Sequence, residues 1–381
     1  MMGARWSRRH LDRLVAGGRT TAPLVDGHTP APLLAGTDRW DPWPVQDPSG
    51  APWVIEGREL WMALSAPAVG HPESRHDVAR LRLLARSGKA WSDLGPVFGE
   101  RASPGSREWS GSAVRHRDGA VSVYYTAVGR RGEATATFVQ RVMEARCVVA
   151  DRDGRPWIEP IAEHRELVRP DGGTYLPADE IDGAPGSIKA FRDPSYFQDP
   201  KDGREYLLIA ASVPWRGRFM GAIALVARDR GRWSLQPPIL QAEGINHEIE
   251  RPHIVVDESR YYLFFSAQRH AFHPPHAAPT GLYGFVAHEL SGPWEPLNGS
   301  GLVIQNPPSA PDQAYAWLVL PDLRAVSFLN YSSPTGADPR RAQADEARQA
   351  FGGTFAPILQ LALDASVTSV VVSHDEEEIP R

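Results

Sequence analysis

The stretch GRPWIEP at residues 154–160 is one of four similar turns, in which Gly or Lys leads into a tryptophan followed by polar or acidic residues. The other three are KAWSDL at 89–94, GRWSLQ at 231–236 and GPWEPL at 292–297. Their tryptophans are spaced 66, 76 and 61 residues apart, longer than a WD40 repeat of about 40 to 45 residues but suitable for four strands with long loops. We therefore predict that each turn marks one blade of a β-propeller.

The segments between these turns alternate apolar and polar residues at period two, which is typical of half-buried strands. Examples are AVSVYYT at 120–126, EYLLIAAS at 205–212 and RYYLFFS at 260–266. The 34 glycines and 35 prolines among 381 residues favour many short elements joined by turns. Only 2–16 and 339–350 have a helical pattern, and we expect both to lie outside the core.

We therefore predict an all-β fold, a five-bladed β-propeller with a central funnel. It would form a single catalytic domain over residues 36–381, preceded by an N-terminal extension over residues 1–35.

Composition narrows the possible partners. A formal net charge of −5 offers no basic surface for nucleic acid or for an anionic membrane. No apolar run of about 18 residues predicts a membrane span, and the pair Arg8-Arg9 lacks the apolar region of a signal peptide. We expect a cytoplasmic protein, or one secreted without a classical signal, that acts on a small molecule. Cys147 is the single cysteine, so no internal disulfide and no thiolate metal site are expected.

Three acidic residues stand in unusual frames. Asp41 lies between tryptophans and prolines in RWDPWP, Asp193 follows an arginine in FRDP, and Glu250 follows Glu248 in EIERPH. Each motif alone is also typical of a surface salt bridge. Together they match glycoside chemistry, which uses one carboxylate as nucleophile or base and one carboxyl as acid.

These motifs and four further segments resemble glycoside hydrolase family 68, which comprises levansucrases, inulosucrases and bacterial β-fructofuranosidases. The further segments are EWSGSA at 108–113, GLYGFV at 281–286, SGLVIQNPPSAP at 300–311 and FGGTFAP at 351–357. The resemblance implies a five-bladed propeller and retaining transfer of a fructosyl group. The later segments are more similar to the enzymes of Gram-negative bacteria than to those of Bacillus.

The resemblance also implies roles for individual residues. Asp41 would be the nucleophile, Asp193 would stabilise the oxocarbenium-like transition state, and Glu250 would be the acid and then the base. The implied substrate-binding residues are Trp40, Trp109, Ser110, Arg192, Glu248, Arg251, Gln268 and Tyr315. No cofactor and no metal are implied.

This chain departs from the family pattern at two positions. His247 stands where Bacillus-type members have an aspartate that helps to bind calcium, so we expect no calcium site. Gln268 stands where the family usually has arginine or histidine, at the subsite of the leaving glucose or the acceptor. We also expect the histidines of the loop at 270–276 to bind no metal, because prolines interrupt them and carboxylates are absent.

The leading hypothesis is a sucrose-acting enzyme that passes fructose to water or to sugar acceptors. Hydrolysis and short fructo-oligosaccharides are favoured over long levan, because of Gln268 and the short chain. Alternatives are fructosyl transfer to a specialised acceptor, a fructoside-binding propeller without chemistry, and an arabinan- or xylan-active enzyme on a related scaffold. The last should lack the WDPWP and EIERPH frames, and this chain has both.

Overall fold

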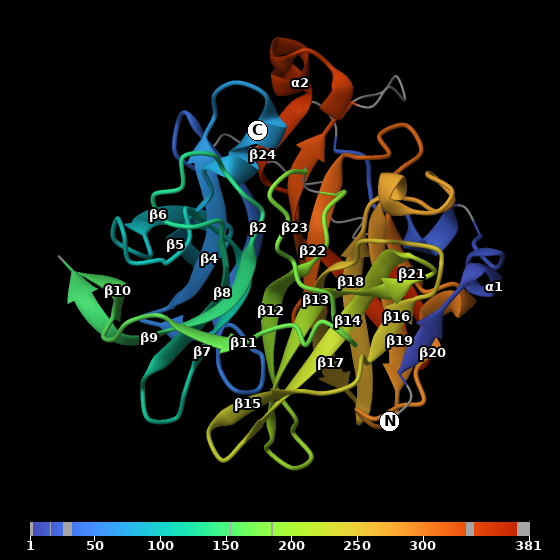
Figure 1. Ribbon diagram of the computed structural model, residues 1–381, viewed down its shortest axis with the longest axis horizontal. Coiled ribbons are helices and arrows are strands. Elements are labelled where there is room, and N and C mark those ends of the chain that lie inside the picture. Colours follow the sequence, from blue (N-terminus) through green and yellow to red (C-terminus); the bar gives the residue numbers. More distant parts are fainter. Residues whose placement is uncertain are drawn as a thin grey trace, which may run out of the picture.

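The computed structural model describes residues 3–15, 17–25, 33–152, 154–183, 186–332 and 339–371. Most of the elements are strands, and they form five successive antiparallel blades around a common centre (Figure 1). The prediction of an all-β, five-bladed propeller is confirmed. Among the described residues, no helix has the length and apolar character needed to cross a membrane.

Blades I and II share one continuous sheet, because β2 and β7 pair in parallel. Blade I consists of β2 (Thr37–Gln46), β3 (Val54–Ile55), β4 (Arg58–Pro67), β5 (Arg80–Ser87) and β6 (Ala90–Pro96). Blade II consists of β7 (Arg107–Arg115), β8 (Val121–Val128), β9 (Gln140–Arg152), β10 (Arg155–Pro160) and β11 (Arg165–Val168). Cys147 is buried in β9, and this burial raises the pKa of its thiol to about 12.

The remaining blades follow in chain order. Blade III contains β12 (Phe191–Gln198), β13 (Glu205–Trp215), β14 (Arg218–Asp229), β15 (Arg232–Leu235) and β16 (Leu240–Ala242). Blade IV contains β17 (Glu250–Asp257), β18 (Arg260–Ala267), β19 (Gly281–Ala287), β20 (Glu295–Pro296) and β21 (Leu302–Gln305). Blade V contains β22 (Ala314–Val319), β23 (Arg324–Tyr331), β24 (Phe351–Phe355), β25 (Leu359–Asp364) and β26 (Val367–Val371).

The four tryptophan turns lie at equivalent positions in blades I to IV, at the start of an outer strand. Trp91, Trp157 and Trp233 lie in the outer strands β6, β10 and β15, and Trp294 directly precedes β20. Each begins the last strand of its hairpin, so the repeat in the sequence corresponds to the blades. Blade V ends in β26 without a tryptophan.

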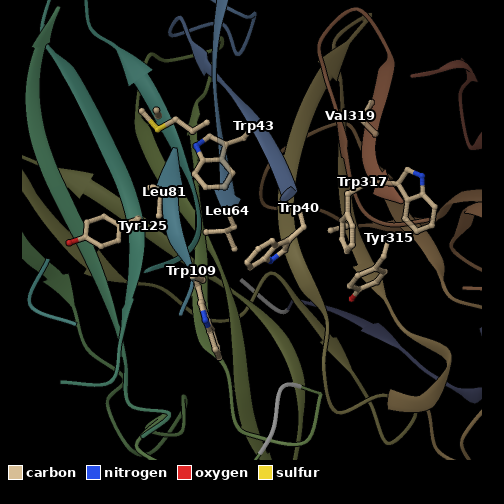
Figure 2. Packing of buried hydrophobic residues seen from close by; sticks show 14 of the residues in the cluster. Trp40, Trp43, Leu64, Leu81, Trp109, Tyr125, Tyr315, Trp317 and Val319 are labelled. Atoms are coloured by element: carbon tan, nitrogen blue, oxygen red, sulfur yellow. The ribbon is translucent and has the colours of Figure 1, made fainter. Parts of the chain in front are cut away.

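The five inner strands enclose the centre of the molecule. β2, β7, β12, β17 and β22 contact one another in this order, and β22 contacts β2, which closes the ring. Aromatic side chains of these strands belong to the buried cluster in Figure 2, where Trp40 lies between Trp109 and Tyr315. These strands therefore surround the central channel of the propeller.

The helical prediction for residues 2–16 is wrong in part. Residues Ala4–Trp6 form β1, which pairs in parallel with β16, and only Arg8–Leu11 form a short helix, α1. Trp6 is fully buried and packs edge-on against Phe265 and Phe272. The open edge of β16 and the burial of this indole outweigh the local helical pattern, so the segment is part of the core.

The second helical prediction agrees more closely with the structure. Pro339–Arg341 form the 3-10 turn η5, and Ala344–Ala350 form the helix α2 beside β24 at the top of Figure 1. The other 3-10 turns are η1 (Gly18–Thr20), η2 (Pro72–Asp77), η3 (Arg269–Ala271) and η4 (Leu297–Gly299).

Candidate active site

Each inner strand is interrupted by a β-bulge at a corresponding position. The register shifts fall between Trp40 and Trp43 in β2, and between Arg192 and Ser195 in β12. The other three inner strands shift after Trp109, Glu250 and Tyr315. Bulges re-aim side chains and are frequent beside active sites. Here they direct side chains from all five blades toward the channel.

The bulges hold non-glycine residues in left-handed backbone conformations. Asp41 has a φ of 52°, Asp193 of 57°, Arg251 of 51° and Ala316 of 56°. Such conformations are strained for residues with a Cβ and concentrate at functional sites. Two of the three predicted catalytic acids are among these four residues.

Asp41 is half-buried and Asp193 is buried, and both are bonded from neighbouring blades. Asp41 Oδ2 accepts a short hydrogen bond from Ser110 Oγ of blade II. Asp193 Oδ2 accepts a bond of 3.3 Å from the backbone N–H of Arg251. The backbone N–H of Asp193 donates to Thr126 Oγ1 at 3.0 Å. These contacts fix each carboxylate relative to the adjacent inner strand.

Glu250 is held by two donors from different blades. Arg192 Nη2 donates to Glu250 Oε1 at 3.0 Å, and the hydroxyl of Tyr315 makes a short bond to Glu250 Oε2. Arg192 Nη2 also makes a short bond to Glu248 Oε1, so one guanidinium joins both glutamates of the EIERPH motif. Although burial opposes the charged form, Glu248 and Glu250 raise the pKa of Arg192 above its ordinary value. Arg192 therefore remains a cation at any working pH.

The acids of the site lie close enough to affect one another's ionisation. Burial raises the pKa of Asp41, although Arg251 and the bond from Ser110 act in the opposite direction. Burial also raises the pKa of Asp193 and of Glu248; Arg192 opposes both shifts, while the charge of Glu250 adds to them. Crowded carboxylates of this kind hold protons at higher pH than isolated ones, which is a property of sites for acid and base chemistry.

Replacing Asp193 by Asn should stabilise the fold at alkaline pH. Burial raises the pKa of Asp193 in the folded state, so the ionised carboxylate opposes folding at pH values above that pKa. The Asn variant lacks this penalty, and we expect its Tm to exceed that of the native chain by about 2 °C or more at pH 8. The difference should shrink as the pH falls toward 3.8, the ordinary pKa of an aspartate.

Thermal unfolding of both chains between pH 4 and pH 8 measures this difference. Asp118→Asn is a suitable control because that side chain is 67% exposed. It should show no gain that depends on pH. An Asp193→Asn chain less stable than the native one at pH 8 would contradict the prediction.

Arg251 links three inner strands beneath the carboxylates. Its Nη1 donates to the carbonyl oxygen of Ala316 at 2.6 Å, and its Nη2 donates to that of Pro42 at 2.8 Å. Both terminal nitrogens of this predicted substrate-binding residue thus bind the backbone. Its charge still acts on the acids, since it opposes the rise that burial causes in the pKa of Asp41.

The pocket above the bulges is narrow and polar, with a volume of about 60 Å³. It is lined by Trp40, Asp41, Glu73, Arg75, His76, Glu250, Gln268, His270, Tyr315, Phe328, Asn330 and Arg340. A cavity of about 800 Å³ lies on the other side of the bulges, lined by later residues of the same strands such as Trp43, Ser112 and His253. Asp41 and Glu250 line the small pocket and not the larger cavity, whereas Asp193 lines neither, so the small pocket is the candidate active site.

The turn η2 adds residues that the motifs did not indicate. The guanidinium carbon of Arg75 lies 5.3 Å from the ring centre of Trp40 and 4.7 Å from that of Phe351. The carbonyl oxygen of His76 accepts the indole N–H of Trp109 at 2.9 Å. These residues belong to the segment HPESRHD at 71–77. It has no tryptophan or apolar residues around its charged ones, so the sequence did not indicate a site there.

The histidines noted in the sequence contact a backbone oxygen, an arginine and one another. His247 Nε2 lies 2.7 Å from the carbonyl oxygen of Gly186, and its Nδ1 lies 3.2 Å from His273 Nε2. His270 faces the pocket beside Arg340. Within the described ranges, no three His, Cys, Asp or Glu side chains come together as metal ligands.

A five-bladed propeller with three carboxylates and a buried arginine at one end of its channel has the architecture of a carbohydrate-active enzyme. The profile of the levansucrase and invertase family, glycoside hydrolase family 68, matches residues 1–218 and 213–380. The chain therefore belongs to this family, and it is an enzyme of the fructosyltransferase and glycoside hydrolase class.

Individual relatives agree with this assignment. The levansucrase LscA of Pseudomonas savastanoi pv. glycinea is 32% identical, over 95% of this chain and 92% of its own length. A levansucrase of Zymomonas mobilis is 30% identical, over 90% of this chain and 84% of its own. The solved inulosucrase from Halalkalicoccus jeotgali bound to kestose is 36% identical with a TM-score of 0.90, and the match covers all of both chains.

Proposed function

We propose that this enzyme is a retaining β-fructosyl enzyme that acts on sucrose, releases glucose and passes fructose to water or to a sugar hydroxyl. The observation that carries this proposal is the different bonding of the acids. Asp41 has a single hydroxyl donor, Ser110, whereas Glu250 is held between Arg192 and Tyr315. The relatives named as levansucrases and the inulosucrase bound to kestose support the substrate class.

In the first step, Asp41 attacks the anomeric carbon of the fructosyl unit as the bond to the glucosyl oxygen breaks. Glu250 in its acid form gives its proton to that oxygen, and glucose leaves. The product is a fructosyl ester on Asp41. Asp193 lies close enough to interact electrostatically with Asp41 and Glu250, and it stabilises the positive charge that develops on the fructosyl ring.

In the second step, Glu250 takes a proton from water or from an acceptor hydroxyl. The resulting oxygen nucleophile attacks the same carbon, and Asp41 leaves as a carboxylate. Two displacements at one carbon give net retention of configuration.

Several buried polar atoms support binding of a hydroxyl-rich ligand. Among the described residues, Trp40 Nε1, Arg192 Nη1 and Glu248 Oε2 have no hydrogen-bond partner. Buried polar atoms are rarely left without one, so these atoms suit fructosyl hydroxyls. In this proposal Trp40, Trp109, Ser110, Arg192, Glu248 and Tyr315 surround the fructosyl unit, and Arg251 supports the acids from below.

Product analysis with sucrose tests the proposal directly. We expect equal or excess glucose relative to fructose, with the remaining fructosyl groups in short oligosaccharides, because the pocket is narrow. Chromatography of the products over time measures substrate use, hydrolysis and chain length together. Abundant long fructan with little free fructose would contradict the preference for short products, and no turnover of sucrose would contradict the substrate.

A specialised acceptor other than sucrose remains the second candidate. The half-buried residues Gln268, His270 and Arg340 line the pocket. The family usually has arginine or histidine at the position of Gln268, so this part of the pocket differs in its side chains. Mass spectrometry of reactions with sucrose and a panel of hydroxyl acceptors separates the two cases. A product with a non-sugar acceptor that dominates over hydrolysis would favour the second.

A further inference from the structure

Gln268 is engaged by an arginine from another blade. It follows β18 of blade IV, directly before η3, and its Oε1 accepts a bond of 2.8 Å from Arg340 Nη1. The same nitrogen contacts His270 Nδ1 at short range. Arg340 belongs to η5, between β23 and β24 of blade V. The guanidinium of Arg340 therefore lies beside Gln268, the position where the family usually has arginine or histidine.

Arg340 shares the pocket with an acidic residue. Glu73 of η2 lines the same pocket, and its Oε1 accepts bonds from the hydroxyl of Tyr331 at 2.7 Å and from Arg75 Nη1 at 3.2 Å. Burial would raise the pKa of Glu73, but Arg75 and other charges, including Arg340, lower it to about 2. The pocket therefore presents the carboxylate of Glu73 and the guanidinium of Arg340, which interact electrostatically.

The segment that carries Arg340 is anchored on blade I. Arg348 of α2 donates from Nη1 to Asp38 Oδ2 at 2.5 Å, and from Nε to the carbonyl oxygen of Gly70 at 3.2 Å. Its Nη2 donates to the carbonyl oxygen of Val69 at 3.3 Å. Arg348 therefore attaches the segment that follows Arg340 to blade I, while Gln268 accepts a bond from Arg340 itself.

We propose that Arg340 is a specificity-determining residue that binds the sugar beyond the fructosyl unit, both as the leaving glucosyl group and as the acceptor. This inference rests on the proposed function. Its guanidinium would donate to neighbouring hydroxyls of a pyranose, and Glu73 would accept from the same ring. Gln268 and His270 are then positioning residues, because they act on the sugar through Arg340.

The test compares two fructosyl donors in the full-length enzyme. Sucrose has a glucosyl group that would reach Arg340, whereas β-fructofuranosyl fluoride has only a fluoride. We expect Arg340→Gln to lower kcat/KM for sucrose by about 10-fold or more, the loss typical of a charged hydrogen bond, and to leave kcat/KM for the fluoride within about 2-fold. The ratio of transfer to hydrolysis at fixed sucrose should also fall.

Arg341→Gln is the matched control, because Arg341 is the exposed neighbour in the same turn. It should resemble the native enzyme with both donors. Gln268→Leu removes the acceptor that positions Arg340 and should reproduce the loss on sucrose with no loss on the fluoride. This variant also tests the inference if Arg340→Gln unfolds, which a Tm measurement would reveal.

The results separate this inference from the proposed function. A native enzyme inactive on both donors would overturn the proposed function itself. A native enzyme active on both, with an Arg340→Gln variant unchanged on both or impaired equally on both, would overturn the role of Arg340 alone.

Discussion

Replacing Asp41 by Asn is expected to lower kcat for sucrose by about 10⁴-fold or more, because an amide cannot form the fructosyl ester. The change is nearly isosteric, and the Asn side chain can still accept the bond from Ser110. Burial raises the pKa of Asp41, so removing this charge should not lower the Tm. Loss of activity without loss of stability is the expected signature of a nucleophile.

Steady-state kinetics and thermal unfolding of the same preparations check this expectation. Asp47→Asn is a control in the turn that follows β2, where Asp47 accepts bonds from Ser49 outside the pocket. It should retain native activity. Mass spectrometry after rapid acid quenching should find a fructosylated native enzyme and no adduct on the Asp41→Asn chain. An adduct on that variant, or activity within about 100-fold of native, would assign the nucleophile elsewhere.

The second large effect is expected for Glu250→Gln, with a strong dependence on the leaving group. Glucose leaves only with protonation of its oxygen, so we expect kcat/KM for sucrose to fall by about 10³-fold or more. Fluoride needs little such help, so β-fructofuranosyl fluoride should lose far less in its first step. Glu250 is the first residue of β17 and lines the pocket, and both of its carboxylate oxygens accept hydrogen bonds.

Glu248→Gln gives the comparison within the same motif. Glu248 bonds to Arg192 and to the backbone N–H of Gly186, and it does not line the pocket mouth. We expect its loss to impair both donors to a similar degree, because it would act on the fructosyl unit common to both. If Glu250→Gln lost activity equally on both donors, and Glu248→Gln lost more on sucrose than on the fluoride, Glu248 would be the acid and Glu250 the residue that binds the fructosyl unit.

The three acids could be singled out from the residues that flank them in the sequence. Asp41, Asp193 and Glu250 each stand in a local motif of aromatic, arginine or proline residues, and each motif forms an inner strand with a bulge. Local sequence is informative here because the backbone strain at a bulge requires particular neighbours. The tryptophan turns indicated the blades for a similar reason, since each one begins an outer strand.

Other features depended on contacts that no local pattern records. Residues 4–6 form a strand only because the edge of β16 lies beside them. Glu73 and Arg340 are separated by 267 positions and meet only through the closure of the ring. The partner of Gln268 could not be predicted for the same reason, because Arg340 belongs to a different blade.

The amino-acid sequence by itself determined the all-β class, the repeat of blades and the chemical identity of the acids. These properties follow from side-chain type and from periodicity over a few residues. Only the tertiary structure decided which acid is bonded to which donor, which end of the channel carries the pocket, and which cation lies beside Gln268. The physical reason is that burial, charge and hydrogen bonding at this site arise between strands from five different blades, and each strand contributes only one or two side chains.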